Sequence, residues 1–298
     1  MSTAFVLCGG GSLGAVQVGM LRALRERGIV PDLLIGTSVG ALNAAFISSA
    51  GLTSGSLDQL AAVWKRVRRK DVFPFAPWRQ LRALTGHQHA LCSNTSLRRL
   101  IEANLPYRRL EDASIPVHLV ATNVLTGEPV CLSTGDPITA VLASSAIPAI
   151  LPAVQIDGEW LCDGAVAANA GISQAVSLGA DRVYLLPAGY ACALPRPPSS
   201  APGAALHALS LIIQRQALLE VAYHSNLVDL RVLPPLCPMS VSPLNFGHGA
   251  ELIARGYRAT RSWLASGDDR MPHLERFLAF HDHRPTDTES TTTDPRMA

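Results

Sequence analysis

Charged side chains are scarce in this sequence: Asp, Glu, Lys and Arg make up 16% of its 298 residues, whereas hydrophobic residues make up 48%. Such a composition excludes a largely disordered chain and favours a large buried core. The length fits one large domain or two small ones. The formal net charge is only +2. A chain that binds nucleic acid is usually strongly basic, and this one is not, so we expect no nucleic-acid partner.

The paired cysteines of zinc and redox motifs are also missing. The six cysteines are far apart, and no Cys-x-x-Cys occurs. In a chain of this length, scattered thiols are typical of reduced residues in the core.

The sequence has little that resembles a secretion signal or a membrane span. Its N-terminus lacks a basic region and has only a short apolar run, so we predict no secretory signal. Of two charge-free stretches, 33–57 is interrupted by small polar residues and 137–156 contains three prolines, which break a continuous helix. We therefore expect a cytoplasmic protein, and peripheral contact with a membrane from one side stays open.

What the sequence does contain is a repeated order of strand, glycine turn and helix. Residues 5–7 form a continuous apolar run, followed by a glycine loop and by apolar residues at helical spacing up to Leu24. The same order returns over 33–50. Strands buried on both faces and alternating with helices are typical of a mainly parallel sheet covered by helices. The sequence therefore predicts an α/β fold.

The remaining chain is interpreted as one domain with an insertion. Residues 64–110 combine a basic run with an aromatic, proline-rich stretch, and we interpret them as a cap-like insertion over the sheet. Pro, Thr, Asp and Ser dominate from Asp282 onward, so we predict a disordered tail over 282–298. Residues 1–281 are assigned to the domain itself.

The first candidate site is Gly36-Thr37-Ser38-Val39-Gly40, between an apolar strand and a helix. A sharp turn there would expose Ser38 as a nucleophile at a helix N-terminus, where free N–H groups favour a developing anion. Gly36 and Gly40 fit the crowded positions on either side of the serine, because glycine has no Cβ. The alternative is that Ser38 only caps the helix, among small residues that pack closely.

A second candidate is the glycine loop after the first strand. Gly9-x-Gly11-x-x-Gly14 matches the dinucleotide-binding fingerprint, so a nucleotide-binding module is one interpretation. That fingerprint wants an acidic residue at the end of the second strand, whereas Asp32 precedes the strand. The other interpretation is an oxyanion hole, in which the backbone N–H groups of the loop lie beside Ser38 at one edge of the sheet.

Asp163 is the third candidate, at the end of an apolar strand in Cys-Asp-Gly-Ala. A carboxylate at that edge can act as a base or orient one. The alternative is a turn residue, because Asp-Gly is a common hairpin signal.

Taken together, these motifs resemble the patatin-like phospholipase family. The resemblance covers about Phe5 to Leu186, in the order that the family has. It implies a three-layer α/β/α fold and hydrolysis of lipid acyl esters, with neither metal nor cofactor. It also implies a dyad of Ser38 as nucleophile and Asp163 as base, with Gly9, Gly10 and Gly11 as the oxyanion hole. The matching residues are Gly9 to Gly14, Gly36 to Gly40, the block Ala143 to Pro152, and Asp163-Gly164-Ala165 with Asn169.

Two positions depart from the family pattern. Leu13 stands where many members have a basic residue, which puts charge assistance at the oxyanion loop and a preference for anionic phospholipids in doubt. Ala165 replaces the second glycine of Asp-Gly-Gly, a familiar variant.

Rival functions stay open beside this resemblance. An ordinary α/β-hydrolase triad would need a histidine after the acid, and His248 satisfies the chain order Ser38, Asp163, His248. A non-catalytic lipid-binding or nucleotide-binding module is the alternative from another class.

The segment Lys65 to Trp78 is a candidate membrane contact. Its basic side chains could attract anionic head groups, and Phe73, Phe75 and Trp78 could insert at a lipid interface. The alternative is a solvated helix face followed by a loop that packs on the core.

Overall fold

The sheet at the centre of the computed structural model is mainly parallel. The model describes residues 1–74, 89–168, 170–194 and 196–267. Within these ranges the strand order is β5-β6-β3-β2-β1-β7-β8, and β4 pairs with β3. The strands are β1 (Thr3–Leu7), β2 (Leu33–Thr37), β3 (Val117–Asn123), β4 (Pro129–Leu132), β5 (Val154–Ile156), β6 (Glu159–Asp163), β7 (Arg182–Leu186) and β8 (Asp229–Val232). Strands β3, β2, β1, β7 and β8 run parallel, whereas β4, β5 and β6 pair antiparallel.

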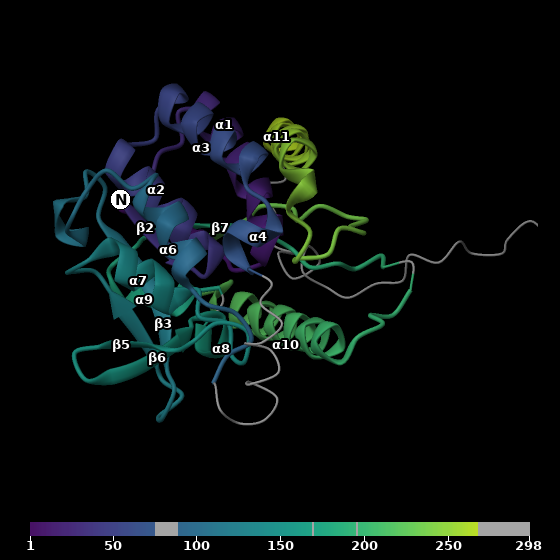
Figure 1. Ribbon diagram of the computed structural model, residues 1–298. Helices are drawn as coiled ribbons and strands as arrows, with labels where there is room; N and C mark the ends of the chain where they lie inside the picture. Colours follow the sequence, from purple (N-terminus) through teal and green to yellow (C-terminus); the bar gives the residue numbers. More distant parts are fainter. Residues whose placement is uncertain (75–88, 169, 195, 268–298) are drawn as a thin grey trace, which may run out of the picture.

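Helices cover both faces of this sheet (Figure 1). The longer helices are α1 (Ala15–Glu26), α2 (Val39–Ala50), α3 (Ser54–Arg66), α6 (Thr95–Glu102), α7 (Pro137–Ser144), α10 (Ala201–His224) and α11 (Gly249–Ser266). The short ones are η1 (Gly11–Gly14), α4 (Arg69–Val72), η2 (Leu110–Asp112), α8 (Ala165–Ala168), α9 (Ile172–Ser177) and η3 (Phe246–His248).

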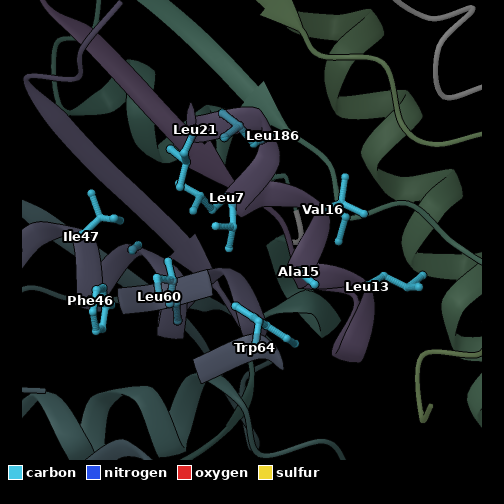
Figure 2. Close-up of a cluster of buried hydrophobic side chains, with 14 of the residues drawn as sticks. Leu7, Leu13, Ala15, Val16, Leu21, Phe46, Ile47, Leu60, Trp64 and Leu186 are labelled. Atoms are coloured by element: carbon cyan, nitrogen blue, oxygen red, sulfur yellow. The ribbon is translucent and has the colours of Figure 1, made fainter. Parts of the chain in front are cut away.

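Alternating side chains of β1 show the three layers. Phe5 and Leu7 join a core cluster with α1, α2, α3 and α11, and Figure 2 shows part of this cluster around Leu7. Ala4 and Val6 point to the other face, where they join α9 and α10. Both faces of the strand are therefore buried, which explains why its sequence is a continuous apolar run. The predicted three-layer α/β/α fold with a mainly parallel sheet is confirmed.

The loops that contain the candidate site residues lie at the carboxyl edge of the parallel strands. β1 runs into the glycine loop and η1, and β2 runs into α2. The two strands are hydrogen-bonded neighbours, with Leu7 opposite Gly36. β6 approaches from the opposite direction and pairs with β3, so that Asp163 lies opposite Ala121. Three segments that are far apart in the sequence thus meet at one edge.

The segment predicted as a cap begins inside the core. Trp64 lies in the last turn of α3, is 5% exposed and stacks on Phe246, with ring centroids 6.5 Å apart. Residues 75–88 of the cap fall outside the described residues, as do residues 268–298 with the predicted tail over 282–298. The domain boundaries therefore stay a prediction.

The expectation that Phe73 inserts at a lipid interface is wrong for the fold described. Its side chain is 7% exposed and packs edge to face against Phe246, with the centroids 6.1 Å apart. The basic residues from Lys65 to Lys70 are exposed. Phe75 and Trp78 lie outside the described residues.

The cysteines fit the expected core positions only in part. No disulfide joins the six, all of which lie within the described residues. Cys8, Cys92 and Cys162 are buried, whereas Cys131 and Cys237 are exposed. Across the described residues, no helix combines the length and the apolar character that crossing a membrane requires.

Candidate active site

Ser38 occupies a strained turn between β2 and α2. Its backbone has φ 55° and ψ −121°, a positive φ that is rare for a residue with a side chain. Neighbouring segments hold this conformation in place. The Ser38 N–H donates a hydrogen bond of 2.9 Å to Oγ of Ser144, and that hydroxyl donates one of 2.5 Å to the carbonyl oxygen of Val120. Ser144 is fully buried. Its two hydrogen bonds connect the turn to α7 and to β3.

The glycines around the turn allow the backbones to approach closely. A Cβ on Gly40 would lie 2.0 Å from the carbonyl oxygen of Leu7, and one on Gly36 would lie 2.6 Å from the backbone of α2. A Cβ on Gly164 would lie 2.1 Å from the carbonyl oxygen of Val120, and one on Gly14 would lie 2.6 Å from the side chain of Val39. Only glycine fits such positions without a shift of the neighbouring chain. The sequence prediction of a sharp, crowded strand-to-helix turn agrees with this geometry.

Asp163 lies directly against the Ser38 hydroxyl. Ser38 Oγ donates a hydrogen bond of 2.6 Å to Asp163 Oδ2. The backbone N–H of Ala165 donates one of 2.9 Å to the other carboxylate oxygen, Oδ1. The two side chains are nearly buried, with Ser38 7% and Asp163 4% exposed. The carboxylate is therefore fixed on both oxygens and faces the serine without an intervening group.

Burial raises the pKa of Asp163 from 3.8 to about 6. The dominant cause is the loss of water around the charged form, which disfavours ionisation. Hydrogen bonds from Ser38 and Ala165 to the carboxylate act in the opposite direction and lower the pKa. The result is a carboxylate that is a stronger base than a solvent-exposed Asp and still ionised at neutral pH.

The glycine loop borders the same cavity as Ser38 and Asp163. Gly9, Gly10 and Gly11 line a cavity together with Ser38 and Asp163. Among the described residues, no acceptor is found for the N–H groups of Gly10 and Gly11, whereas the N–H of Ser12 donates to the carbonyl oxygen of Pro243 at 2.8 Å. Gly10 and Gly11 therefore bring two backbone donors to the wall of the cavity that contains Ser38, and an oxyanion hole is built from such donors.

Two cavities open beside Ser38. The larger, about 180 Å³, lies between the glycine loop, the segment after β7 and the inner face of α10. The smaller, about 60 Å³, lies under α3, α4 and α6. Both walls are mainly apolar. Ser38, Gly11, Phe73 and Ile147 contribute to both, so the serine stands at their junction.

The remaining candidate residues lie elsewhere. His248 Nδ1 is 3.0 Å from Glu251 Oε2, and the histidine side chain is 40% exposed. It lines neither of the two cavities at Ser38. Asp32 accepts the N–H of Thr3 at 2.8 Å, at the opposite end of β1 from the glycine loop. Leu13 is fully buried in the core.

Asn169, part of the family resemblance, lies outside the described residues. Among the residues that are described, no group of three or more His, Cys, Asp or Glu is placed to hold a metal ion.

Ser144 is a functional candidate that sequence reasoning did not single out. It lies within the block Ala143 to Pro152, one of the stretches that carry the resemblance to the family. A serine inside an apolar helix that ends before Pro148 was the available signal. Its contact with the Ser38 turn is a tertiary hydrogen bond, which the spacing of residues in the sequence does not reveal.

Comparison with known proteins gives relatives that are much longer than this chain. Lysophospholipase nte1 of Aspergillus terreus is 27% identical over 188 residues, which cover 63% of this chain and 12% of that protein. Lysophospholipase NTE1 of Pyricularia oryzae is 28% identical over 195 residues, with the same coverages. The chain thus spans about an eighth of the length of these curated relatives.

A solved structure and a family model complete the comparison. VipD from Legionella pneumophila is 16% identical, with a TM-score of 0.46, and the match covers 89% of this chain and 67% of that one. The model of the patatin-like phospholipase family matches residues 5–176, more than half of the chain. The resemblance predicted from the motifs is thereby confirmed, and the chain belongs to the patatin-like phospholipase family.

Proposed function

We propose that the chain is a serine hydrolase that cleaves the acyl esters of lipids, with Ser38 as nucleophile and Asp163 as its base. The observation that carries this proposal is the direct hydrogen bond of 2.6 Å between the two side chains in a nearly buried site. A general base must lie within about 2.6–3.2 Å of the proton that it takes. No imidazole is needed to relay the proton between them.

The reaction divides into two acyl transfers. Asp163 takes the proton of Ser38 Oγ while that oxygen attacks the ester carbonyl carbon. The tetrahedral intermediate collapses when protonated Asp163 returns the proton to the leaving alkoxide, which departs as an alcohol. Water then attacks the acyl-serine and gives a proton to Asp163, and Asp163 passes this proton to Ser38 Oγ as the fatty acid is released.

The glycine loop supplies the charge stabilisation in this scheme. The negative charge that develops on the carbonyl oxygen can accept hydrogen bonds from Gly10 and Gly11 N–H. Each such donor typically contributes about 2.7–4 kcal/mol to the transition state. The start of α2 behind Ser38 adds the favourable end of a helix dipole.

A lipid as substrate is supported by the shape of the site and by the family. The cavities at Ser38 are mainly apolar, which suits alkyl chains. The chain belongs to a phospholipase family, and the relatives described above are named lysophospholipases. Phospholipid, lysophospholipid and neutral ester all fall within this proposal.

The geometry disfavours the rival functions. A triad would place a histidine between the serine and the acid, whereas Ser38 bonds Asp163 directly and His248 pairs with Glu251. A dinucleotide site wants a carboxylate at the end of the second strand, but Asp32 lies at its start.

Turnover by the purified chain tests the proposal. A series of p-nitrophenyl esters, followed by a panel of phospholipids, lysophospholipids and acylglycerols, should show release of nitrophenol and of fatty acid. Ser38→Ala, measured in parallel, should release neither. A well-folded wild-type protein that hydrolyses none of these esters would refute the proposal.

The pH dependence of kcat/KM should report the titration of Asp163. Below about 6 the carboxyl is protonated in the free enzyme and cannot accept the Ser38 proton. We expect kcat/KM for an uncharged ester to fall about ten-fold per pH unit below that pKa and to level off above it. The residual activity of Asp163→Asn should not show this decrease at low pH. A wild-type profile that stays flat between pH 4.5 and pH 8 would contradict the assignment.

We also propose that the exposed basic residues from Lys65 to Lys70 bring the enzyme to anionic membranes. This attraction needs only their charge and no insertion of Phe73, which is buried. Each basic side chain near such a surface contributes about 1 kcal/mol. Replacing Lys65, Arg66, Arg68, Arg69 and Lys70 by Gln should therefore weaken binding to vesicles that contain anionic lipid. The matched control, Arg258→Gln with Arg261→Gln on α11, should bind as wild type does. Equal binding by all three proteins would refute a membrane role for this segment.

A further inference from the structure

The two cavities at Ser38 differ in one respect that bears on substrate choice. Asp163 lines the larger cavity but does not contribute to the wall of the smaller one. Ser38 and Gly11 border both. Asp163 therefore lies on the side of Ser38 that faces the larger cavity. A group bound in the larger cavity can receive a proton from it, whereas a group bound in the smaller cavity cannot.

The tetrahedral carbon of the intermediate carries four substituents, and the protein groups that each one must meet decide which cavity it enters. One substituent is Ser38 Oγ, and the oxyanion points to the N–H groups of Gly10 and Gly11. Asp163 must deliver its proton to the leaving oxygen, so the leaving group has to lie on the side of the larger cavity. The acyl chain takes the direction that remains, toward the smaller cavity.

The smaller cavity has the chemistry that an acyl chain needs. Apart from Ser38, Gly11 and Ser145, its described wall is hydrophobic and comes from α3, α4, α6 and their neighbours. An alkyl chain gains free energy with each methylene that leaves water. The residues of α3, α4 and α6 that line it are Val63, Trp64, Val72, Leu97 and Leu100.

The larger cavity suits a leaving group that has an alkyl chain better than one that has none. Its volume is about 180 Å³, against about 60 Å³ for the smaller, and most of its wall is apolar. Among the described residues that line it, Asp163 and His207 are present and no Lys or Arg is. The glycerophosphodiester released from a monoacyl lipid would cover little of this apolar wall. A leaving group with its own alkyl chain would bury that chain along Leu206, Leu209 and Ile213 of α10.

We infer that the smaller cavity holds the scissile acyl chain and the larger one holds a leaving group that carries a second apolar chain. The preferred substrates are then diacyl lipids rather than lysophospholipids. This inference rests on the proposed function and narrows it to a substrate class. It also separates this chain from the named activity of its longer relatives.

A comparison of matched soluble lipids tests the substrate class on the wild-type protein. Dihexanoylphosphatidylcholine, dihexanoylglycerol and hexanoyl-lysophosphatidylcholine share one acyl chain and differ in the leaving group. Below their micellar concentrations, kcat/KM for both diacyl lipids should exceed that for the monoacyl lipid by about ten-fold or more. A lysophospholipid hydrolysed as fast as the diacyl lipids, or faster, would overturn the inference. Failure to hydrolyse any ester would instead refute the proposed function itself.

Two cavity-filling variants test which chain occupies which cavity. Leu100→Trp fills the smaller cavity and should lower the ratio of kcat/KM for p-nitrophenyl decanoate over acetate about ten-fold. Ser210→Phe fills the larger one and should lower the ratio for dihexanoylphosphatidylcholine over p-nitrophenyl hexanoate by a similar factor. Leu219→Trp, on the exposed side of α10 at 58% exposure, is the control and should leave both ratios unchanged. The opposite pattern in the two variants would reverse the assignment and so overturn it.

Discussion

Ser38→Ala and Asp163→Asn are each expected to lower kcat/KM for ester hydrolysis by about four orders of magnitude or more. The first variant removes the attacking oxygen. The second keeps the shape and polarity of the side chain but cannot take the proton from Ser38 Oγ. Because the two groups are joined by one hydrogen bond of 2.6 Å, we expect them to act as a unit. Initial rates on p-nitrophenyl esters, with folding checked by circular dichroism, measure the effect.

The double variant and a histidine variant serve as controls for this prediction. Ser38→Ala combined with Asp163→Asn should be little worse than either change alone, as expected for residues that work together. His248→Ala should retain substantial turnover, because His248 is bonded to Glu251 and lines neither cavity. Full activity in Asp163→Asn, or an inactive but folded His248→Ala, would favour a triad instead.

Gly40→Ala should destabilise the fold by about 4 kcal/mol or more. The new Cβ would lie 2.0 Å from the carbonyl oxygen of Leu7 and 2.8 Å from that of Cys8. Both atoms belong to the backbone at the end of β1, so the strand or α2 has to move, and the core that they share is disrupted. Chemical denaturation monitored by tryptophan fluorescence gives the change in the free energy of unfolding.

Gly55→Ala is the matched control for this prediction. Gly55 also lies in a helix, α3, but nothing comes closer to its added Cβ than a side-chain oxygen at 3.9 Å. Alanine is the better helix former, so this variant should be as stable as wild type or more stable by up to about 1 kcal/mol. If Gly40→Ala unfolds at the same denaturant concentration as Gly55→Ala, the close packing of the serine turn is not as described.

The parts of the fold and site that could be predicted from sequence are those encoded locally. The apolar runs of β1 and β2, each followed by glycines and a helical pattern, predict parallel strands with loops at one edge. The spacing of Gly36, Ser38 and Gly40 identifies the turn, because each of these residue types meets a local steric demand. The prediction that Asp163 lies near Ser38 rests on the apolar strand pattern that precedes each of them and on the resemblance to the family, and the structure places the two side chains in contact.

The parts that could not be predicted depend on contacts between distant segments. Phe73 follows a basic stretch, where its sequence context predicts an exposed aromatic, but it is buried in the core cluster and packs against Phe246 from a distant part of the chain. Ser144 fixes the Ser38 backbone through a hydrogen bond between α7 and the turn that joins β2 to α2. The cavities need α3, α6 and α10 to assemble around the glycine loop, so neither their size nor their lining follows from any single stretch of sequence.

The most direct test of the Ser38–Asp163 dyad is the rate at which a fluorophosphonate labels the protein, with the modified residue located by peptide mass spectrometry. This measurement reports nucleophile activation alone, independently of lipid binding or product release. Wild type and His248→Ala should be labelled at Ser38 at similar rates, Asp163→Asn slowly, and Ser38→Ala not at all. Labelling of Asp163→Asn at the wild-type rate, or of wild type at a residue other than Ser38, would contradict the dyad.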